Sequence, residues 1–289
     1  MKPLQRVGVL AHPFQNSTAP IAEQVASSLR ARGLETWVRT AWDAANARPL
    51  VENSDLVVAI GGDGAMLRTA RVCSVFNVPI FGINAGHLGF LAEATVADWP
   101  SAFERLLSGD YWIEDRMMLH CEVWSGDQQT SQGDALNDVV ISRGAIARPA
   151  QLAAYINDTW TTTYNADGLI VATPTGSTAY ALAVGGPILP PQLRNILMVP
   201  VAPHLSMERP LVLAEDTVVK VVVTPRTYEA EVVVTVDGEL IGSMNAEDYI
   251  LIRASQQVSS FVRLREQGYF FRSILDRLEP RLVMQRRQE

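Results

Sequence analysis

The stretch Asp55-Leu56-Val57-Val58-Ala59-Ile60-Gly61-Gly62-Asp63-Gly64 is an apolar run that ends in three glycines around one carboxylate. Five consecutive apolar residues before a glycine cluster are typical of a buried parallel strand. Residues 65–72 then repeat apolar side chains at helical spacing, so the glycines lie where a strand turns into a helix. Glycine backbones approach phosphates closely, and the first N–H groups of a helix bind anions. The stretch therefore predicts an anion-binding turn in an α/β domain.

Asp63 is an unexpected residue for such a turn. A carboxylate beside a bound phosphate is repulsive unless it holds a metal or accepts a proton from a reacting hydroxyl, and either role indicates phosphoryl transfer. The alternative is that Asp63 caps the helix, for which aspartate is a favoured residue. Glycine on both sides of Asp63 is not required by a cap and favours the first interpretation, but these residues alone leave both open.

Length and composition limit the class of protein. A chain of 289 residues is long enough for two domains. The net charge of −7 argues against a nucleic-acid binder, and no basic cluster occurs before the C-terminal end. Cys73 and Cys121 are far apart without C-x-x-C spacing, so neither a disulfide framework nor a zinc site is expected, which favours a cytoplasmic protein.

Three further classes are disfavoured by the same sequence. The most apolar region, residues 169–189, is interrupted by prolines, glycines and hydroxyls, so no membrane span is expected. The apolar run 7–11 is too short for a signal peptide and is expected to be a first strand. Lys2 and Lys220 are the only lysines, so a P-loop of the G-x-x-x-x-G-K-[ST] type is excluded.

The first domain is expected to span residues 1–115. Strands are predicted near residues 7–10, 36–38, 56–60 and 79–84, alternating with helices; the last helix has Trp99, Phe103, Leu106 and Leu107 on one face. Such alternation predicts an open parallel sheet covered by helices, with ligands at the carboxyl ends of the strands. Asp63 and Asn84 both fall at such ends.

The second domain is expected to span residues 116–264 and to be an all-β sandwich or layered sheet. Its predicted strands are 119–124, 139–142, 152–156, 159–163, 169–172, 196–199, 218–224, 232–236 and 249–252. Asn157-Asp158 and Asp237-Gly238 are typical hairpin turns. Residues 265–289 return to helical spacing, and we expect this amphipathic helix to pack back on the first domain. A helix packed on the sandwich is the alternative.

Three stretches in the second domain are unusually polar. Asn137-Asp138 directly precedes a strand, where an ordinary turn is the simpler explanation. The run 164–180 places four hydroxyls around Pro174 and Gly176 straight after a buried strand, which a core segment would avoid. His204 lies between prolines and strands, where a structural hydrogen-bonding histidine is the simpler interpretation.

Together these residues resemble the NAD kinase family. The glycine motif alone is weak, because diacylglycerol and sphingosine kinases share it and phosphofructokinases do so more loosely. The run from Asp167 to Pro187 is the specific one, since it is similar to the dinucleotide-binding core of the family almost residue for residue. The matching motifs are Gly61-Gly62-Asp63-Gly64, residues 82–91, Asn137-Asp138, residues 167–187, Pro203-His204 with Arg209-Pro210, and residues 236–239.

The resemblance implies phosphorylation of the 2′-hydroxyl of the adenosine ribose of NAD, giving NADP, with ATP or another donor such as polyphosphate and Mg²⁺. Asp63 would then accept or orient the proton of that hydroxyl, while metal and backbone N–H groups bind the phosphates. The resemblance also implies a homodimer or homotetramer. We expect neither a nucleic acid nor a membrane as partner.

By similarity, one set of residues would contact the dinucleotide. Carboxylates of this set accept hydrogen bonds from ribose hydroxyls, the amide reads a base edge, the tyrosine covers a ring and the arginines supply positive charge. The set is Asp63, Gly64, Arg68, Asn137, Asp138, Arg148, Asn165, Asp167, Thr178, Ala179, Tyr180, Ala183 and Glu239. Three positions depart from the family: Ala65 stands where threonine is usual, Asp138 where glutamate is more frequent, and Glu239 where glutamine is common.

Two other functions compete with this one. A lipid or sphingoid kinase would share the glycine turn and the two-domain plan, but it should have an apolar or basic membrane-facing surface, for which the acidic chain gives no sign. A non-catalytic dinucleotide sensor would bind NAD(P) and signal through a partner. A sensor gains nothing from a carboxylate beside phosphate, so Asp63 argues against it.

Overall fold

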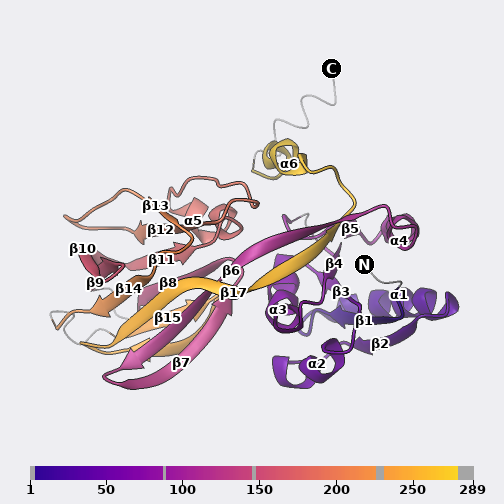
Figure 1. Ribbon diagram of the computed structural model, residues 1–289, viewed down its shortest axis with the longest axis horizontal. Coiled ribbons are helices and arrows are strands. Elements are labelled where there is room, and N and C mark those ends of the chain that lie inside the picture. The colour runs from indigo at the N-terminus through magenta and orange to yellow at the C-terminus, as the bar shows by residue number, and fades with distance from the viewer. Residues whose placement is uncertain (1–3, 87–88, 145–147, 226–230, 279–289) are drawn as a thin grey trace. The chain divides into compact units, whose positions relative to one another are not determined.

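The computed structural model describes residues 4–86, 89–144, 148–225 and 231–278, and the chain forms two compact units (Figure 1). Unit 1 consists of Met1–Asp115 together with Gln257–Glu289, and unit 2 is Arg116–Gln256. The sequence placed the end of the second domain at residue 264, whereas residues 257–264 belong to unit 1. The reason is that the end of the last strand pairs in parallel with a unit 1 strand, with Phe261 opposite Ile80.

Unit 1 is the expected α/β domain with a parallel sheet. Its strands lie in the order β4-β3-β1-β2, all in parallel pairs. The chain leaves β1 to one side and returns to the other side as β3, so the carboxyl ends of β1 and β3 flank a topological switch point, where open α/β sheets bind ligands. The elements are β1 (Arg6–Ala11), η1 (Asn16–Thr18), α1 (Ala19–Ala31), β2 (Glu35–Arg39), α2 (Ala44–Val51), β3 (Leu56–Gly61), α3 (Asp63–Cys73), η2 (Ser74–Phe76), β4 (Ile80–Asn84), β5 (Ala94–Thr95), α4 (Trp99–Leu107) and α6 (Tyr269–Leu278).

Both faces of this sheet are buried. One face packs against α1 and α4, and Trp99, Phe103 and Leu106 contribute to that core. On the other face, Gly82 faces Met66 of α3, whose sulfur lies 2.9 Å from the position of a Cβ at Gly82. The prediction that Leu107 shares the buried face of α4 is wrong: its side chain is 37% exposed, because the helix ends there and Leu107 points away from the core.

Unit 2 contains the expected antiparallel sandwich. One sheet has the order β13-β12-β11-β8-β15-β16, and the other contains β10-β9-β14 followed by β17, with β6 pairing β17 and β7. Side chains from both sheets form one apolar core between them. The elements are β6 (Trp112–Ser125), β7 (Gln128–Ala135), β8 (Asp138–Arg143), β9 (Ala150–Ile156), β10 (Thr159–Ala166), β11 (Gly168–Ala172), η3 (Gly176–Thr178), α5 (Tyr180–Ala183), β12 (Asn195–Val201), β13 (Leu211–Ala214), β14 (Val219–Val223), β15 (Val232–Val236), β16 (Glu239–Met244) and β17 (Tyr249–Arg263).

Both predicted hairpin turns are confirmed. Asn157 and Asp158 join β9 to β10 with positive φ values of 48° and 62°, and Asp237 and Gly238 join β15 to β16 with 47° and 78°. These are the left-handed conformations that a two-residue hairpin requires. Strands β7, β13 and β16 were not predicted.

The C-terminal helix packs on unit 1, as expected. Tyr269 and Phe270 at its start are buried, and the Tyr269 hydroxyl donates to Glu114 Oε2 at 3.0 Å. The Phe270 ring lies 6.3 Å from that of Phe90. In Figure 1 this helix, α6, follows β17 at the yellow end of the chain. Among the described residues, none of the helices is both long and apolar enough to cross a membrane.

Candidate functional site

The glycine turn between β3 and α3 has the open backbone that the sequence predicts. Gly61 has a φ of +152°, and a Cβ there would lie 2.7 Å from that of Ala65, so only glycine fits. Gly62 is the N-cap of α3, and its carbonyl accepts from the amides of Ala65 and Met66. A Cβ at Gly62 or Gly64 would meet no atom within 4 Å. A ligand can therefore approach this backbone closely.

The Asp63 carboxylate is held by a neighbouring loop. Its two oxygens accept from the amides of Phe90 at 3.0 Å and Leu91 at 3.2 Å. The alternative that Asp63 caps the helix is wrong, because Gly62 occupies the N-cap and the helix has no side-chain cap bond. A Cβ at Gly89 would lie 2.0 Å from Asp63 Oδ1, so the loop closes tightly around the carboxylate. An ionised carboxylate has about four acceptor sites, which leaves capacity for a substrate proton.

Arg68 extends the unit 1 site toward the end of β1. Its guanidinium lies 5.2 Å from the centre of the Phe14 ring, a cation–π distance. Burial and the charge of Arg68 lower the pKa of His12, which directly follows β1. Gly64 is exposed in the first turn of α3. Asp63, Gly64 and Arg68 thus stand on one helix at the switch point, and His12, whose pKa is lowered, lies near Arg68.

The polar stretches of unit 2 meet at one end of β11. Ala172, the last residue of β11, pairs with Asp138, the first residue of β8. Thr173 donates from its amide to the Asn137 carbonyl at 2.8 Å and from its hydroxyl to the Leu136 carbonyl at 2.6 Å. A Cβ at Gly176 would lie 2.1 Å from the Asn137 carbonyl oxygen. The Asn137-Asp138 turn is therefore packed directly against the hydroxyl-rich run.

The remaining predicted contacts at this end follow the same run or the adjoining hairpin. The Thr178 hydroxyl donates to the Thr175 carbonyl, and the Tyr180 side chain is 46% exposed, so its ring is available to a ligand. Ala179 is the N-cap of the short helix α5 and Ala183 is its last residue, and Glu239 begins β16.

Asp138 is the buried carboxylate of this group. Its side chain is 6% exposed. Burial, and then the negative charge of Asp237, raise the pKa of Asp138 to about 7. A carboxylate that is held so far from water is well placed to accept hydrogen bonds from ligand hydroxyls, which would replace the lost hydration.

The other predicted contacts lie at the opposite end of β11. Asp167 precedes this strand, and the Asp167 carboxylate is bound by Arg143 through Nε at 2.8 Å and Nη2 at 3.4 Å. The five residues of β11 span about 17 Å. The predicted set in unit 2 therefore divides into a group around Asp138 and a group of Asn165 and Asp167; Arg148 stands two residues before β9, whose first residues pair with Asn165 and Ala166.

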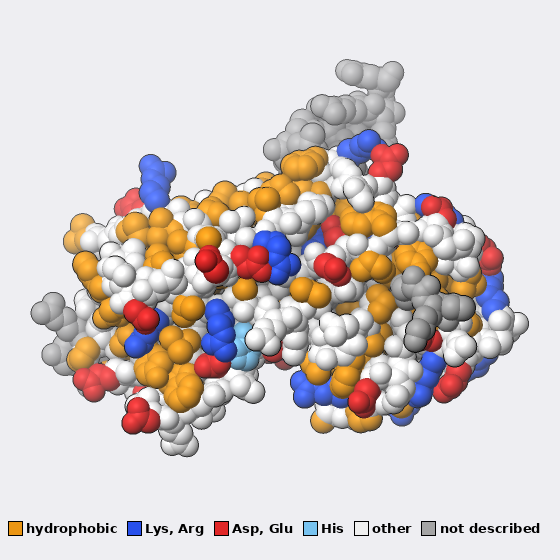
Figure 2. Space-filling view, viewed as in Figure 1, with side chains coloured by type: hydrophobic (Ala, Val, Ile, Leu, Met, Phe, Trp, Pro, Cys, Tyr) orange, Lys and Arg blue, Asp and Glu red, His pale blue; other side chains and the backbone are white. Residues whose placement is uncertain are grey.

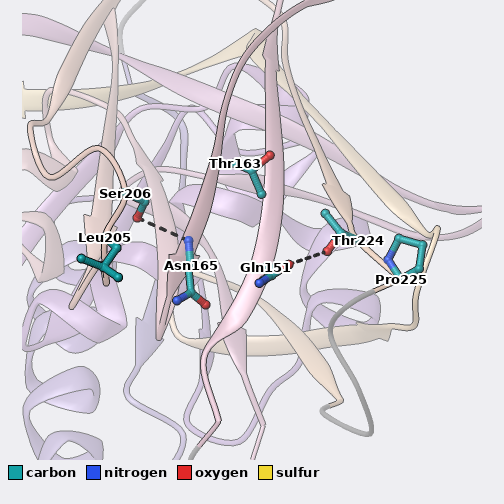
Figure 3. Close-up of a pocket in the computed structure, with 7 residues that line it drawn as sticks. All are labelled: Gln151, Thr163, Asn165, Leu205, Ser206, Thr224 and Pro225. Atoms are coloured by element: carbon teal, nitrogen blue, oxygen red, sulfur yellow. Dashed lines mark hydrogen bonds between the residues drawn. The ribbon is translucent and has the colours of Figure 1, made fainter.

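A pocket of about 510 Å³ opens beside Asn165 (Figure 3). The Asn165 amide donates to the Ser206 hydroxyl at 3.3 Å, and its carbonyl accepts from the His204 amide at 2.7 Å. All lining side chains are uncharged, and the polar ones are amides or hydroxyls. The lining residues are Gln151, Thr163, Asn165, Leu205, Ser206, Thr224 and Pro225.

The charged groups of the described residues do not form a metal cage. Basic and acidic side chains are interspersed on the face shown in Figure 2. Within the described ranges, no group of three or more His, Cys, Asp or Glu residues is arranged to hold a metal ion.

Sequence reasoning missed two neighbours of the site. Arg143 is the ion partner of Asp167, and His12 lies beside Arg68. Neither stands in a motif of its own. The only available signal for Arg143 was its position directly after the predicted strand 139–142, and the pairing of that strand with the one after Asp167 was not predicted.

Comparison with known proteins assigns the chain to a family. Residues 15–111 match the ATP-NAD kinase N-terminal domain and residues 136–264 match the ATP-NAD kinase C-terminal domain. An NAD kinase of Chloroflexus aurantiacus is 38% identical over 275 residues, covering 95% of this chain and 99% of the relative. An NAD kinase of Dehalococcoides mccartyi is 36% identical over 276 residues, covering 95% and 96%.

Solved structures agree on the fold. The crystal structure of yeast NADH kinase complexed with NADH superposes with a TM-score of 0.85 at 24% identity, covering 96% of this chain and 88% of that one. An NAD kinase from Archaeoglobus fulgidus in complex with ATP gives 0.74 at 24% identity, covering 93% and 96%. The fold, the glycine turn with Asp63 and both matched domains lead to one conclusion: this chain belongs to the NAD kinase family.

Proposed function

We propose that this NAD kinase transfers a phosphoryl group from ATP or another donor to the 2′-hydroxyl of the adenosine ribose of NAD. The observation that supports the reaction most directly is the Asp63 carboxylate. It lies in the first turn of α3, beside glycines that leave the backbone open, and two loop amides hold it in place.

Asp63 acts as the general base. Its two hydrogen bonds from Phe90 and Leu91 fix the direction of the carboxylate, and the remaining lone pairs accept the proton of the ribose hydroxyl as that oxygen attacks. The amides at the start of α3 and the guanidinium of Arg68 bind the negative charge of the phosphates.

The residues also suit a magnesium ion that arrives with the donor. Mg²⁺ usually keeps several waters and is bound by one or two carboxylates together with substrate phosphates, rather than by a protein cage. The described residues offer Asp63 at the turn and no cluster of three acidic or histidine ligands, which fits that mode. When bound, the ion neutralises charge on the transferring group.

The second unit would supply most of the contacts to the dinucleotide, in addition to Asp63, Gly64 and Arg68 of unit 1. Asp138 accepts hydrogen bonds from ribose hydroxyls. The side-chain amide of Asn137 exchanges hydrogen bonds with a base edge, and Tyr180 covers an aromatic ring. The group around Asn165 and Asp167, with Arg148, contributes the remaining contacts. We further propose a cytoplasmic homodimer or homotetramer, on the resemblance to the family.

One purified protein and three substrates test the reaction. With Mg²⁺ and ATP, NAD should be converted to NADP while diacylglycerol and sphingosine are unchanged. Removing Mg²⁺ with a chelator should abolish turnover, because Lys2 and Lys220 are the only lysines and neither stands in a phosphate-binding motif.

Other results would select a competing function. Phosphorylation of either lipid in place of NAD would identify a lipid kinase. Because Ala65 lacks the hydroxyl that the family usually has, inorganic polyphosphate should be tried before a negative result with ATP is accepted. Binding of NAD without NADP formation, with every donor and metal, would identify a sensor.

A further inference from the structure

The Asp237 carboxylate binds three consecutive backbone amides. Oδ2 accepts from the Leu136 amide at 3.0 Å, and Oδ1 accepts from the amides of Asn137 at 2.7 Å and Asp138 at 3.2 Å. Hydrogen bonds to an ionised acceptor are stronger than neutral ones. One side chain thus fixes the backbone of the turn that presents Asn137 and Asp138.

The hairpin of Asp237 is joined to the same turn through its backbone. The Asp237 amide donates to the Asp138 carbonyl at 3.0 Å. Val236 pairs with Val139, so β15 holds the hairpin in register with β8. Asp237 has a φ of 47°, which a two-residue hairpin turn needs and which aspartate and asparagine tolerate.

The effect of Asp237 extends beyond the turn. The carbonyls of Leu136 and Asn137 are the acceptors for the hydroxyl and amide of Thr173. The Thr173 hydroxyl in turn accepts from the Gly176 amide at 3.1 Å. The geometry of the hydroxyl-rich run is therefore set by a turn whose amides all point at Asp237.

We propose that Asp237 is a positioning residue of the dinucleotide site, which holds Asn137 and Asp138 in the binding geometry through their backbone. The proposal rests on the proposed function. A simpler role, in which Asp237 only serves the hairpin, would require no carboxylate bonded to three amides of another segment.

The arrangement also has an electrostatic cost, which a purely structural turn would avoid. Asp237 places a second negative charge close to buried Asp138 and contributes to its raised pKa. An asparagine would satisfy the hairpin equally well without this charge. The carboxylate is explained by the three amides that it binds.

The substitution Asp237→Asn tests the proposal in the full chain. Asparagine tolerates the positive φ at this position as well as aspartate does. Its side-chain NH2 group would replace one carboxylate oxygen and face the backbone amides of the turn, and the negative charge would be lost. We expect the KM for NAD to rise about tenfold or more, with the KM for ATP changed less than about twofold, because one acceptor is lost and a donor faces a donor. Calorimetric titration with NAD should show the same loss of affinity.

A matched control is Asp158→Asn, the same substitution at positive φ in the hairpin between β9 and β10. It should leave both KM values unchanged. If Asp237→Asn does not fold, Thr173→Val provides the second variant, since it loosens the same turn by removing the hydrogen bond to Leu136 and should also raise the KM for NAD.

The outcomes distinguish a failure of the positioning role of Asp237 from a failure of the proposed NAD kinase reaction. If Asp237→Asn folds and binds NAD with wild-type affinity, the positioning role is overturned. If Asp237→Asn does not fold, wild-type NAD affinity in Thr173→Val overturns it. Equal losses for NAD and ATP would also overturn it, because they indicate a general disturbance. A wild-type protein that makes no NADP would refute the proposed function instead, and NAD titration of wild type and variant would still decide the role of Asp237.

Discussion

Arg263 donates a hydrogen bond of 2.7 Å from Nη1 to the backbone carbonyl of Leu91, whose amide donates to Asp63. Arg263 is fully buried, and Nε binds Glu114 Oε2 at 2.7 Å. The backbone at Leu91 therefore holds the proposed base on one side and is itself held by the end of β17 on the other.

Replacing Arg263 by leucine should strongly destabilise the protein. The change leaves the buried carboxylates of Glu93 and Glu114 without this cation, and breaking a buried ion pair typically costs about 3–5 kcal/mol. Urea unfolding measures the loss. Arg272→Leu is the control, because the side chains of Arg272 and its partner Glu266 are each 76% exposed. Loss of this ion pair should lower the free energy of unfolding far less. Equal losses in the two variants would show that burial of the Arg263 network adds nothing.

Asp63→Asn should lower kcat by roughly 10²–10⁴-fold and keep NAD affinity within about tenfold, because it removes the base and not the binding surface. Steady-state kinetics and NAD titration measure the two effects. Asp55→Asn is a closely matched control: at the other end of β3, Asp55 also accepts two backbone amides, those of Gln5 and Arg6, both at 2.8 Å. Near-normal turnover in Asp63→Asn would assign Asp63 a structural role only.

Gly89→Ala should reduce turnover by about 10²-fold while the protein stays folded. The new methyl group would lie 2.0 Å from Asp63 Oδ1, so the carboxylate must move, and a displacement of about 1 Å at a reacting group can cost that much. Gly86→Ala is the control in the same segment, since a Cβ there meets no atom within 4 Å. If both variants turn over like wild type, the observed position of Asp63 is not the catalytic one.

The buried Asp138 should make stability depend on pH. Its pKa is raised to about 7, so between about pH 4 and pH 7 the folded state holds more protons than the unfolded state. The free energy of unfolding should therefore fall as pH rises through this range, by an amount on the order of a few kcal/mol. Urea unfolding at several pH values should show a smaller fall in Asp138→Asn. Parallel curves for wild type and variant would contradict the raised pKa.

Much of the fold follows from local patterns in the sequence. The apolar run before Gly61 and the turn signals at Asn157 and Asp237 depend on neighbouring residues alone, and all three are confirmed. Strand β7, Gln128–Ala135, has no alternating apolar pattern, because it is polar and mostly exposed and is a strand through its pairing with β6. Such pairing is a long-range effect that no local pattern reports.

The candidate site was predictable to a similar extent. The glycine turn and the hydroxyl-rich run were found from residue types and spacing. The ion pair of Arg143 with Asp167 and the loop amides that hold Asp63 join residues 24 to 28 positions apart. Their formation depends on strand register and on loop closure, which become visible only in three dimensions. The roles of the predicted contact residues remain predictions that the variants above can test.

Unit 1 is built from two segments at opposite ends of the chain, and this arrangement affects how the protein can fold during synthesis on the ribosome. Unit 2 is one continuous segment, Arg116–Gln256, inserted into unit 1. Domains generally fold as units during synthesis, with the N-terminal one first. Here the order is reversed: residues 4–115 emerge first but must wait until Arg263 is translated to neutralise buried Glu114. The nascent chain therefore carries an incomplete unit 1 while unit 2 folds, and a product that ends soon after Gln256 would have a complete unit 2 attached to an incomplete unit 1.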